Sequence, residues 1–105
     1  MTSNIQDLGK YLQREYGGTK TVMRSESNNA MADFIINGTS FNDPESLLGI
    51  VQDFYEGRGF KRTEGGDEDL GGLEFRDRDG KHIQVVVSYF PKFGKIIGSE
   101  DNLPA

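Results

Sequence analysis

The chain has 105 residues, with seven Phe and four Tyr, no Cys and a formal net charge of −5, which together favour one small folded domain. The absence of Cys excludes disulfides, thiolate catalysis and thiolate zinc sites, and it fits a reducing compartment such as the cytoplasm. The sequence has no signal-peptide pattern, no membrane-span pattern and no basic stripe suited to a nucleic-acid backbone, so we expect no membrane and no direct nucleic-acid binding.

The negative charge is concentrated in one segment. Residues 64–74 hold five of the seventeen acidic residues and no Lys or Arg. The rest of the chain carries twelve acidic and twelve basic residues and is neutral. We therefore expect the acidity to act at one surface rather than through the charge of the whole protein.

Residues 4–16 predict a helix. Apolar side chains recur there at helical spacing, at Ile5, Leu8, Leu12 and Tyr16. Ser3 and Gln6 match an N-terminal capping box, and two glycines at 17 and 18 end the segment. Gly9, inside the segment, disfavours a helix.

The next segment, "TKTVMRSESNNAMADFIING", predicts a hairpin of two strands. The pair Asn28-Asn29 tolerates positive φ and can form a tight turn. That turn sets Met23 opposite Phe34 and Arg24 opposite Asp33, and both are favourable cross-strand pairs.

Residues 44–56 predict a second helix. Asp43 is a suitable N-cap, Pro44 suits the first helical position, and Gly57 ends the segment. A single apolar stripe runs along it and comprises Leu47, Leu48, Val51, Phe54 and Tyr55.

The last third of the chain predicts strands in "GFKRT", "GLEFRD" and "KHIQVVVSYF". The ending "PKFGKIIGSEDNLPA" can hold one more short strand before a polar tail from about residue 98. The element order is α-β-β-α-β-β-β. It is typical of a single α+β domain over residues 1–105, with two helices packed on an antiparallel sheet.

The sequence "DRDG", between two of these strands, resembles part of a calcium-binding EF-hand loop. With Gly80 at the sixth position of such a loop, the first and twelfth positions are Phe75 and Val86, whose side chains cannot bind a metal. The EF-hand interpretation therefore fails.

A three-residue hairpin loop over residues 78–80 explains "DRDG" better. It sets apolar residues opposite each other, Phe75 with Ile83 and Leu73 with Val85, and polar ones likewise, Glu74 with Gln84 and Asp77 with Lys81. A shift by one residue would send one apolar set to the wrong face of the sheet. Gly80 would then take the left-handed conformation that such loops require.

His82, the chain's single histidine, is a candidate general base with a carboxylate such as Asp77 or Glu74. In the favoured register it faces Arg76 on the polar side of the hairpin, where a surface strand residue is expected. The motifs of serine hydrolases, zinc proteases, phosphate-binding loops and dinucleotide-binding folds are absent from the sequence. We therefore predict no metal, no cofactor and no catalytic residue.

The segment "EGGDEDLGGLE", residues 64–74, is the strongest candidate for a binding surface. Acidic side chains attract basic partners, and Leu70 can serve as an apolar anchor among them. The candidate partner-binding residues are Glu64, Asp67, Glu68, Asp69, Leu70 and Glu74. Two other interpretations stay open, namely a flexible, solvated connection between strands and an irregular calcium site formed by Asp67, Glu68 and Asp69.

These features favour a small acidic binding or regulatory protein of the cytoplasm. In one form it would be an inhibitor that covers a basic surface of a protein partner. One alternative is a small enzyme that uses His82 with a nearby carboxylate. The other is a structural subunit that assembles through an exposed strand edge or the segment "FGKIIG".

Overall fold

The computed structural model of the chain describes residues 3–21, 32–41, 43 and 45–104. These residues form a six-stranded antiparallel sheet with two α-helices and one short 3-10 helix. The helices are α1 (Asn4–Tyr16), α2 (Ser46–Glu56) and η1 (Glu68–Leu70). The strands are β1 (Thr19–Thr21), β2 (Phe34–Asn37), β3 (Phe60–Arg62), β4 (Gly72–Asp77), β5 (His82–Phe90) and β6 (Lys95–Asn102).

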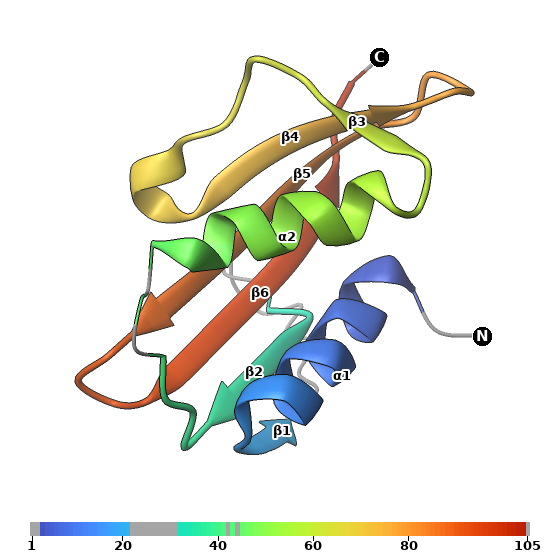
Figure 1. Cartoon of the computed structure of the whole chain (residues 1–105). Coiled ribbons are helices and arrows are strands. Elements are labelled where there is room, and N and C mark those ends of the chain that lie inside the picture. The colour runs from blue at the N-terminus through green and yellow to red at the C-terminus, as the bar shows by residue number, and fades with distance from the viewer. Residues whose placement is uncertain (1–2, 22–31, 42, 44, 105) are drawn as a thin grey trace.

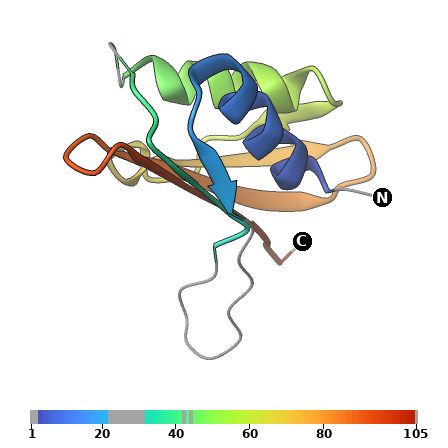
Figure 2. The same ribbon diagram turned by 90° about the horizontal axis from the view of Figure 1, so that it is seen from below.

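The strand order across the sheet is β1-β2-β6-β5-β4-β3, and neighbouring strands are antiparallel. Both α-helices lie on the same face of the sheet, as Figure 1 and Figure 2 show. The predicted α+β class is therefore confirmed, as is the predicted element order, to which β6 adds a strand. The other face of the sheet carries no helix within the described residues.

The first predicted helix is confirmed over its full length. The Ser3 hydroxyl accepts a hydrogen bond from the Gln6 N–H at 3.3 Å, which satisfies one of the open amides at the helix start. The Gln6 side chain does not return to Ser3. It donates to the carbonyl of Asp33 at 3.1 Å and so ties α1 to the start of β2.

The second helix begins at Ser46, two residues later than predicted. The Asp43 carboxylate accepts the N–H of Glu45 at 3.2 Å, and its carbonyl accepts the N–H of Ser46 at 3.1 Å. Asp43 therefore closes a turn just before the helix rather than capping the helix itself. The predicted first helical residue, Pro44, lies outside the described residues, and the predicted end at Gly57 is confirmed.

The predicted register of the β4–β5 hairpin is confirmed. Phe75 pairs with Ile83 and Leu73 pairs with Val85. Gly80 has φ +82°, which is the left-handed conformation expected for this loop.

The β1–β2 pair differs from the expected register where it is described. A tight turn at Asn28-Asn29 would bring Thr21 opposite Ile36, whereas Thr21 pairs with Ile35. The turn itself, Met23 and Arg24 lie outside the described residues, so the two expected pairings that involve them stay predictions.

The predicted polar tail from about residue 98 is wrong, because β6 continues to Asn102 and is flanked by β2 and β5. Both the side chain and the backbone of Glu100, in this polar half of the strand, have long-range partners. The Tyr55 hydroxyl donates to Glu100 Oε1 at 2.6 Å, and the Glu100 N–H donates to Asp33 Oδ2 at 2.8 Å. Since residues 95–97 are paired on both sides, the segment "FGKIIG" does not offer a free strand edge.

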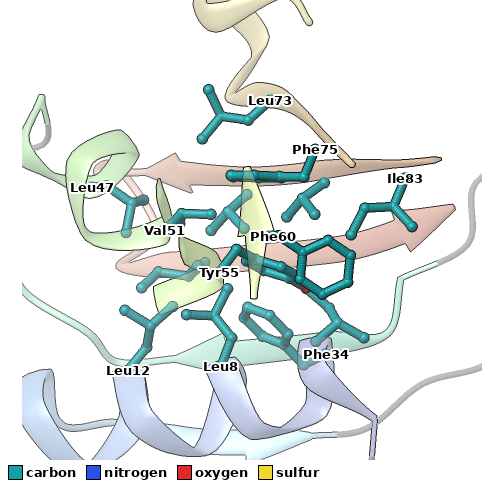
Figure 3. Close-up of a cluster of buried hydrophobic side chains, with 14 of the residues drawn as sticks. Leu8, Leu12, Phe34, Leu47, Val51, Tyr55, Phe60, Leu73, Phe75 and Ile83 are labelled. Carbon is teal, nitrogen blue, oxygen red and sulfur yellow. The ribbon is translucent and has the colours of Figure 1, made fainter. Parts of the chain in front are cut away.

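The core lies between the sheet and the two α-helices (Figure 3). In this view Leu8 and Leu12 point into it from α1 below, and Val51 points into it from α2. The ring of Tyr55 stacks on Phe75 of β4 with ring centroids 5.0 Å apart. Burying these side chains holds α2 on the sheet.

Candidate functional site

The acidic segment between β3 and β4 is a packed loop that contains η1. Asp67 is the N-cap residue of η1, and its carboxylate accepts the N–H of Asp69 at 3.1 Å. The carbonyl of Asp67 accepts the N–H of Gly72 at 2.8 Å, and the Ser88 hydroxyl donates to the carbonyl of Leu70 at 2.9 Å. These bonds fix the loop against β4 and β5, so its side chains have defined positions.

Two glycines of this loop are needed for its close packing. A Cβ on Gly66 would lie 2.9 Å from the Cα of Leu73, and the Gly66 φ of +103° disfavours any other residue. A Cβ on Gly71, which has φ +80°, would collide with the carbonyl oxygen of Val87. These two glycines therefore allow the loop to pack closely against β4 and β5.

A groove of about 450 Å³ lies where η1, the start of α2 and the end of β5 meet. Figure 1 shows these three segments at the same end of the molecule, with η1 in yellow. The apolar lining comprises Leu47, Leu48, Leu70, Val87, Tyr89 and Phe90, and the acidic lining comprises Glu45, Glu68 and Asp69.

Two of the groove's apolar side chains are unusually exposed. Leu70 is 66% exposed and Phe90 is 41% exposed. Phe93, in the turn that follows Phe90, is 66% exposed and is the third large exposed hydrophobic residue within the described part of the chain. Exposed apolar side chains that gather at one place, with polar residues around them, mark interaction surfaces.

The carboxylates of the groove differ in their partners. Glu68 forms a salt bridge of 2.6 Å with Arg62, which also donates to the Gln52 side chain at 3.0 Å. Asp69 and Glu45 have no salt bridge to any described cation. The groove therefore presents two acidic groups to a partner, and the third is held by the protein's own arginine.

The structure separates the predicted binding residues into three groups. Glu68, Asp69 and Leu70 line the groove. Asp67 is used as the cap of η1, and Glu64 is exposed outside the groove lining. Glu74 lies on the opposite face of the sheet, because it alternates with the buried residues Leu73 and Phe75.

Sequence reasoning missed the other walls of the groove. Glu45 is the N-cap residue just before α2, Leu48 lies in α2 and Phe90 lies in β5, so segments distant from η1 in the sequence are brought together only by the fold. One signal was present in the sequence. Phe90 falls at a position where the alternation of β5 predicts a solvent-facing residue, which is an unusual place for a large aromatic ring.

His82 lies with Glu74 and Arg76 on the face of the sheet opposite the helices. Its Nδ1 is 3.4 Å from a guanidinium nitrogen of Arg76, and its Nε2 is 3.6 Å from Glu74 Oε2. The other expected partner, Asp77, is used in the hairpin, where its carboxylate accepts the N–H of Asp79 at 3.0 Å and of Lys81 at 2.8 Å. Glu74 is therefore the nearer carboxylate for any proton transfer at His82.

A second hollow of about 310 Å³ has the opposite charge. Lys61 of β3 lies directly across from Arg76 of β4, and Arg62 and Arg78 also line this hollow. Like charges directly opposite each other destabilise a sheet, so the pair has no structural benefit of its own. The protein thus carries an acidic groove and a basic hollow at separate places.

The irregular calcium site is not supported by the described geometry. Asp67 is occupied by its hydrogen bond to the backbone and Glu68 by Arg62. Among the residues that the structure describes, no three acidic or histidine side chains gather in a way that could hold a metal ion.

Comparison of the chain with protein-family models, curated proteins and solved structures found no match. Within the described residues, neither helix is long and apolar enough to cross a bilayer. The chemistry of the groove is therefore the basis on which a function is proposed.

Proposed function

We propose that the protein is a small binding protein that recognises a basic surface of a protein partner through the groove formed by η1, α2 and β5. By covering that surface it would act as an inhibitor or regulator. The lack of Cys is consistent with action in the reducing cytoplasm.

One observation carries this proposal. The carboxylates of Glu45 and Asp69, without cationic partners among the described residues, border a groove whose apolar wall includes the exposed Leu70. An apolar centre with a charged border is the usual composition of a protein-binding surface. The charges select basic partners and speed their approach, and the apolar wall slows their release.

The arrangement of η1 also supports recognition. The loop is fixed by the Asp67 cap and by the bond between Ser88 and the carbonyl of Leu70. A partner therefore does not have to order this loop when it binds, which lowers the entropic cost of association.

The test is affinity capture from an extract of the organism that makes the protein, with the protein immobilised. The groove variant carries Glu45→Gln and Asp69→Asn together. The matched control carries Glu64→Gln and Asp53→Asn. These changes also remove two negative charges, but from exposed positions outside the groove lining. We expect a basic protein that binds the wild type and the control but not the groove variant.

The captured protein is then purified and its association rate is measured at two salt concentrations. The rate should fall as salt rises, because charges separated by more than about 10 Å are screened at 0.1 M salt. Equal capture by the groove variant and the control, or no specific capture by the wild type, would show that the groove does not have this function.

The second candidate function is a small enzyme, favoured by the distance of 3.6 Å between His82 Nε2 and Glu74 Oε2. A histidine and a carboxylate at this separation can move a proton after a small adjustment. His82→Gln and Glu74→Gln variants decide between the candidates. If both variants keep partner binding but lose turnover of a substrate, the enzyme is favoured.

A further inference from the structure

The strand β5 is longer than its neighbour β4 at the end that borders the groove. β4 begins at Gly72, opposite Val86, whereas β5 continues to Phe90. The last bond on this side runs from the Val87 N–H to the carbonyl of Gly71 at 2.9 Å. Beyond it, no described strand pairs with this edge of β5.

The backbone of Tyr89 faces the groove. Hydrogen-bonding groups two residues apart in a strand point to the same side, so the N–H and C=O of Tyr89 point the same way as the N–H of Val87. Tyr89 is also part of the groove lining. Its hydroxyl accepts the N–H of Phe41 at 3.3 Å and its ring packs on Phe41, which fixes its backbone in place.

This arrangement indicates what kind of structure would fill the groove. Each residue of a strand advances about 3.3 Å, so the open edge from Ser88 to Phe90 can pair with roughly three residues of an extended segment. Such a segment would lie in line with β4, on the N-terminal side of Gly72. Its side chains would then meet the apolar wall at Leu48 and the carboxylates of Asp69 and Glu45.

We infer that the groove binds an extended segment of the partner, with Lys or Arg and apolar side chains, which adds a short strand to the edge of β5 at Tyr89. This inference rests on the proposed function and specifies the partner's conformation. Strand addition takes its affinity from backbone hydrogen bonds and its specificity from side-chain contacts. An exposed strand edge is otherwise a liability, and here it is only three residues long and bordered by acidic groups.

The probe is an acetylated and amidated peptide of sequence Lys-Val-Lys-Leu-Lys, titrated into the isotope-labelled full chain and followed by the amide signals. Two isomers carry two backbone N-methyl groups each, one at the second and fourth residues and the other at the third and fifth. In an added strand, alternate N–H groups point toward and away from β5. Methyl groups of one isomer would therefore block pairing and those of the other would face solvent.

We expect the Tyr89 amide signal to shift, and we expect one methylated isomer to bind at least about fivefold more weakly than the other. Binding should weaken in the Asp69→Asn variant and not in the Glu64→Gln variant. Equal affinity of the two isomers, with dependence on Asp69 retained, would overturn strand addition and leave the proposed function standing. Peptide binding that ignores Asp69, or no binding, would overturn both.

Self-association is the remaining occupant of this edge. The basic hollow at Lys61 and Arg76 of one molecule could meet the acidic groove of another, in a head-to-tail arrangement. Sedimentation of the wild type across a range of concentrations tests it. If the apparent molecular mass rises with concentration in the wild type and not in the Asp69→Asn variant, the edge is occupied by a second copy and the inference is overturned.

Discussion

The ring of Phe34 lies directly over Gly98, its cross-strand partner in β6, where a Cβ would collide with the ring. On its other side the ring faces α1, where a Cβ on Gly9 would lie 2.9 Å from the Phe34 Cγ. Two glycines from distant parts of the chain thus make room for one buried aromatic side chain. The helical glycine that local propensity disfavours is explained by this tertiary contact.

Two glycine-to-alanine changes in helices are expected to have opposite effects. Gly49→Ala should raise the free energy of unfolding by about 0.5–1 kcal/mol, because a Cβ there meets no atom within 4 Å and alanine favours a helix. Gly9→Ala gains the same propensity but presses on Phe34, whose ring has no room to move because Gly98 lies behind it. Overpacking costs about 1–3 kcal/mol, so a net loss of about 1 kcal/mol is expected. Urea unfolding of the two variants measures both, and a stabilised Gly9→Ala protein would contradict the packing at Phe34.

The hairpin loop between β4 and β5 should depend on Gly80. Its φ of +82° is costly for a β-branched residue, so Gly80→Val should lower the free energy of unfolding by about 1–2 kcal/mol. Arg78→Ala, in the same exposed loop, is the control and should change it by less than about 0.5 kcal/mol. A denaturant midpoint for Gly80→Val equal to that of the control would argue against the turn.

Stability should fall at high pH through Tyr55. Burial, and then the hydrogen bond to Glu100, raise the pKa of Tyr55 well above its ordinary value near 10. The unfolded chain loses this proton near pH 10 and the folded chain keeps it, so the stabilisation is complete below pH 10 and declines above it, by about 1.4 kcal/mol per pH unit. Urea unfolding between pH 9 and pH 11.5 measures the decline.

The Tyr55→Phe variant is the matched control for that decline. It should be less stable than the wild type at pH 7 by about 1–3 kcal/mol, because the Glu100 carboxylate loses its donor. Above pH 10 its stability should decline less steeply. Equal slopes for the two proteins would mean that the folded state does not hold the tyrosine proton.

Removal of the imidazole should matter little to the fold or to partner binding. His82 lies on the face of the sheet opposite α2, outside the groove lining, and its contacts with Arg76 and Glu74 are long. His82→Ala should lower the free energy of unfolding by less than about 1 kcal/mol. Thermal unfolding and partner affinity are the measurements, and a folded variant that has lost all activity would restore the enzyme hypothesis.

The elements that the sequence predicts well are those determined by local rules. The β4–β5 register follows from alternation and a left-handed Gly80, and both act over a few residues. β6 was underestimated because its polar half looks like a tail. It is a strand because it pairs with β2 and β5, and Glu100 in its polar half also contacts Tyr55 and Asp33, which is 67 positions away in sequence. Such long-range partners leave no periodic pattern.

The site was predicted only in part, because long-range contacts also determine which of its residues lie together. Local charge density identified Asp69 and Leu70, but it also included Glu74, which alternation sends to the far face, and Asp67, which caps η1. The carboxylates are thus not interchangeable. Neutralising Glu68 removes its salt bridge to Arg62, so the stability of a variant that changes residues 67–69 together would mix structural and surface effects.

The central position of β6 has a consequence for synthesis on the ribosome. β2 pairs with β1 on one side and with β6 on the other. β6 is translated after every other strand of the sheet. Until β6 emerges, the pairing edge of Phe34–Asn37 has no partner, and α1 has only part of the surface on which it packs. We therefore expect β1, β2 and α1 to stay incompletely folded until β6 leaves the exit tunnel, and to be open to chaperones up to that moment.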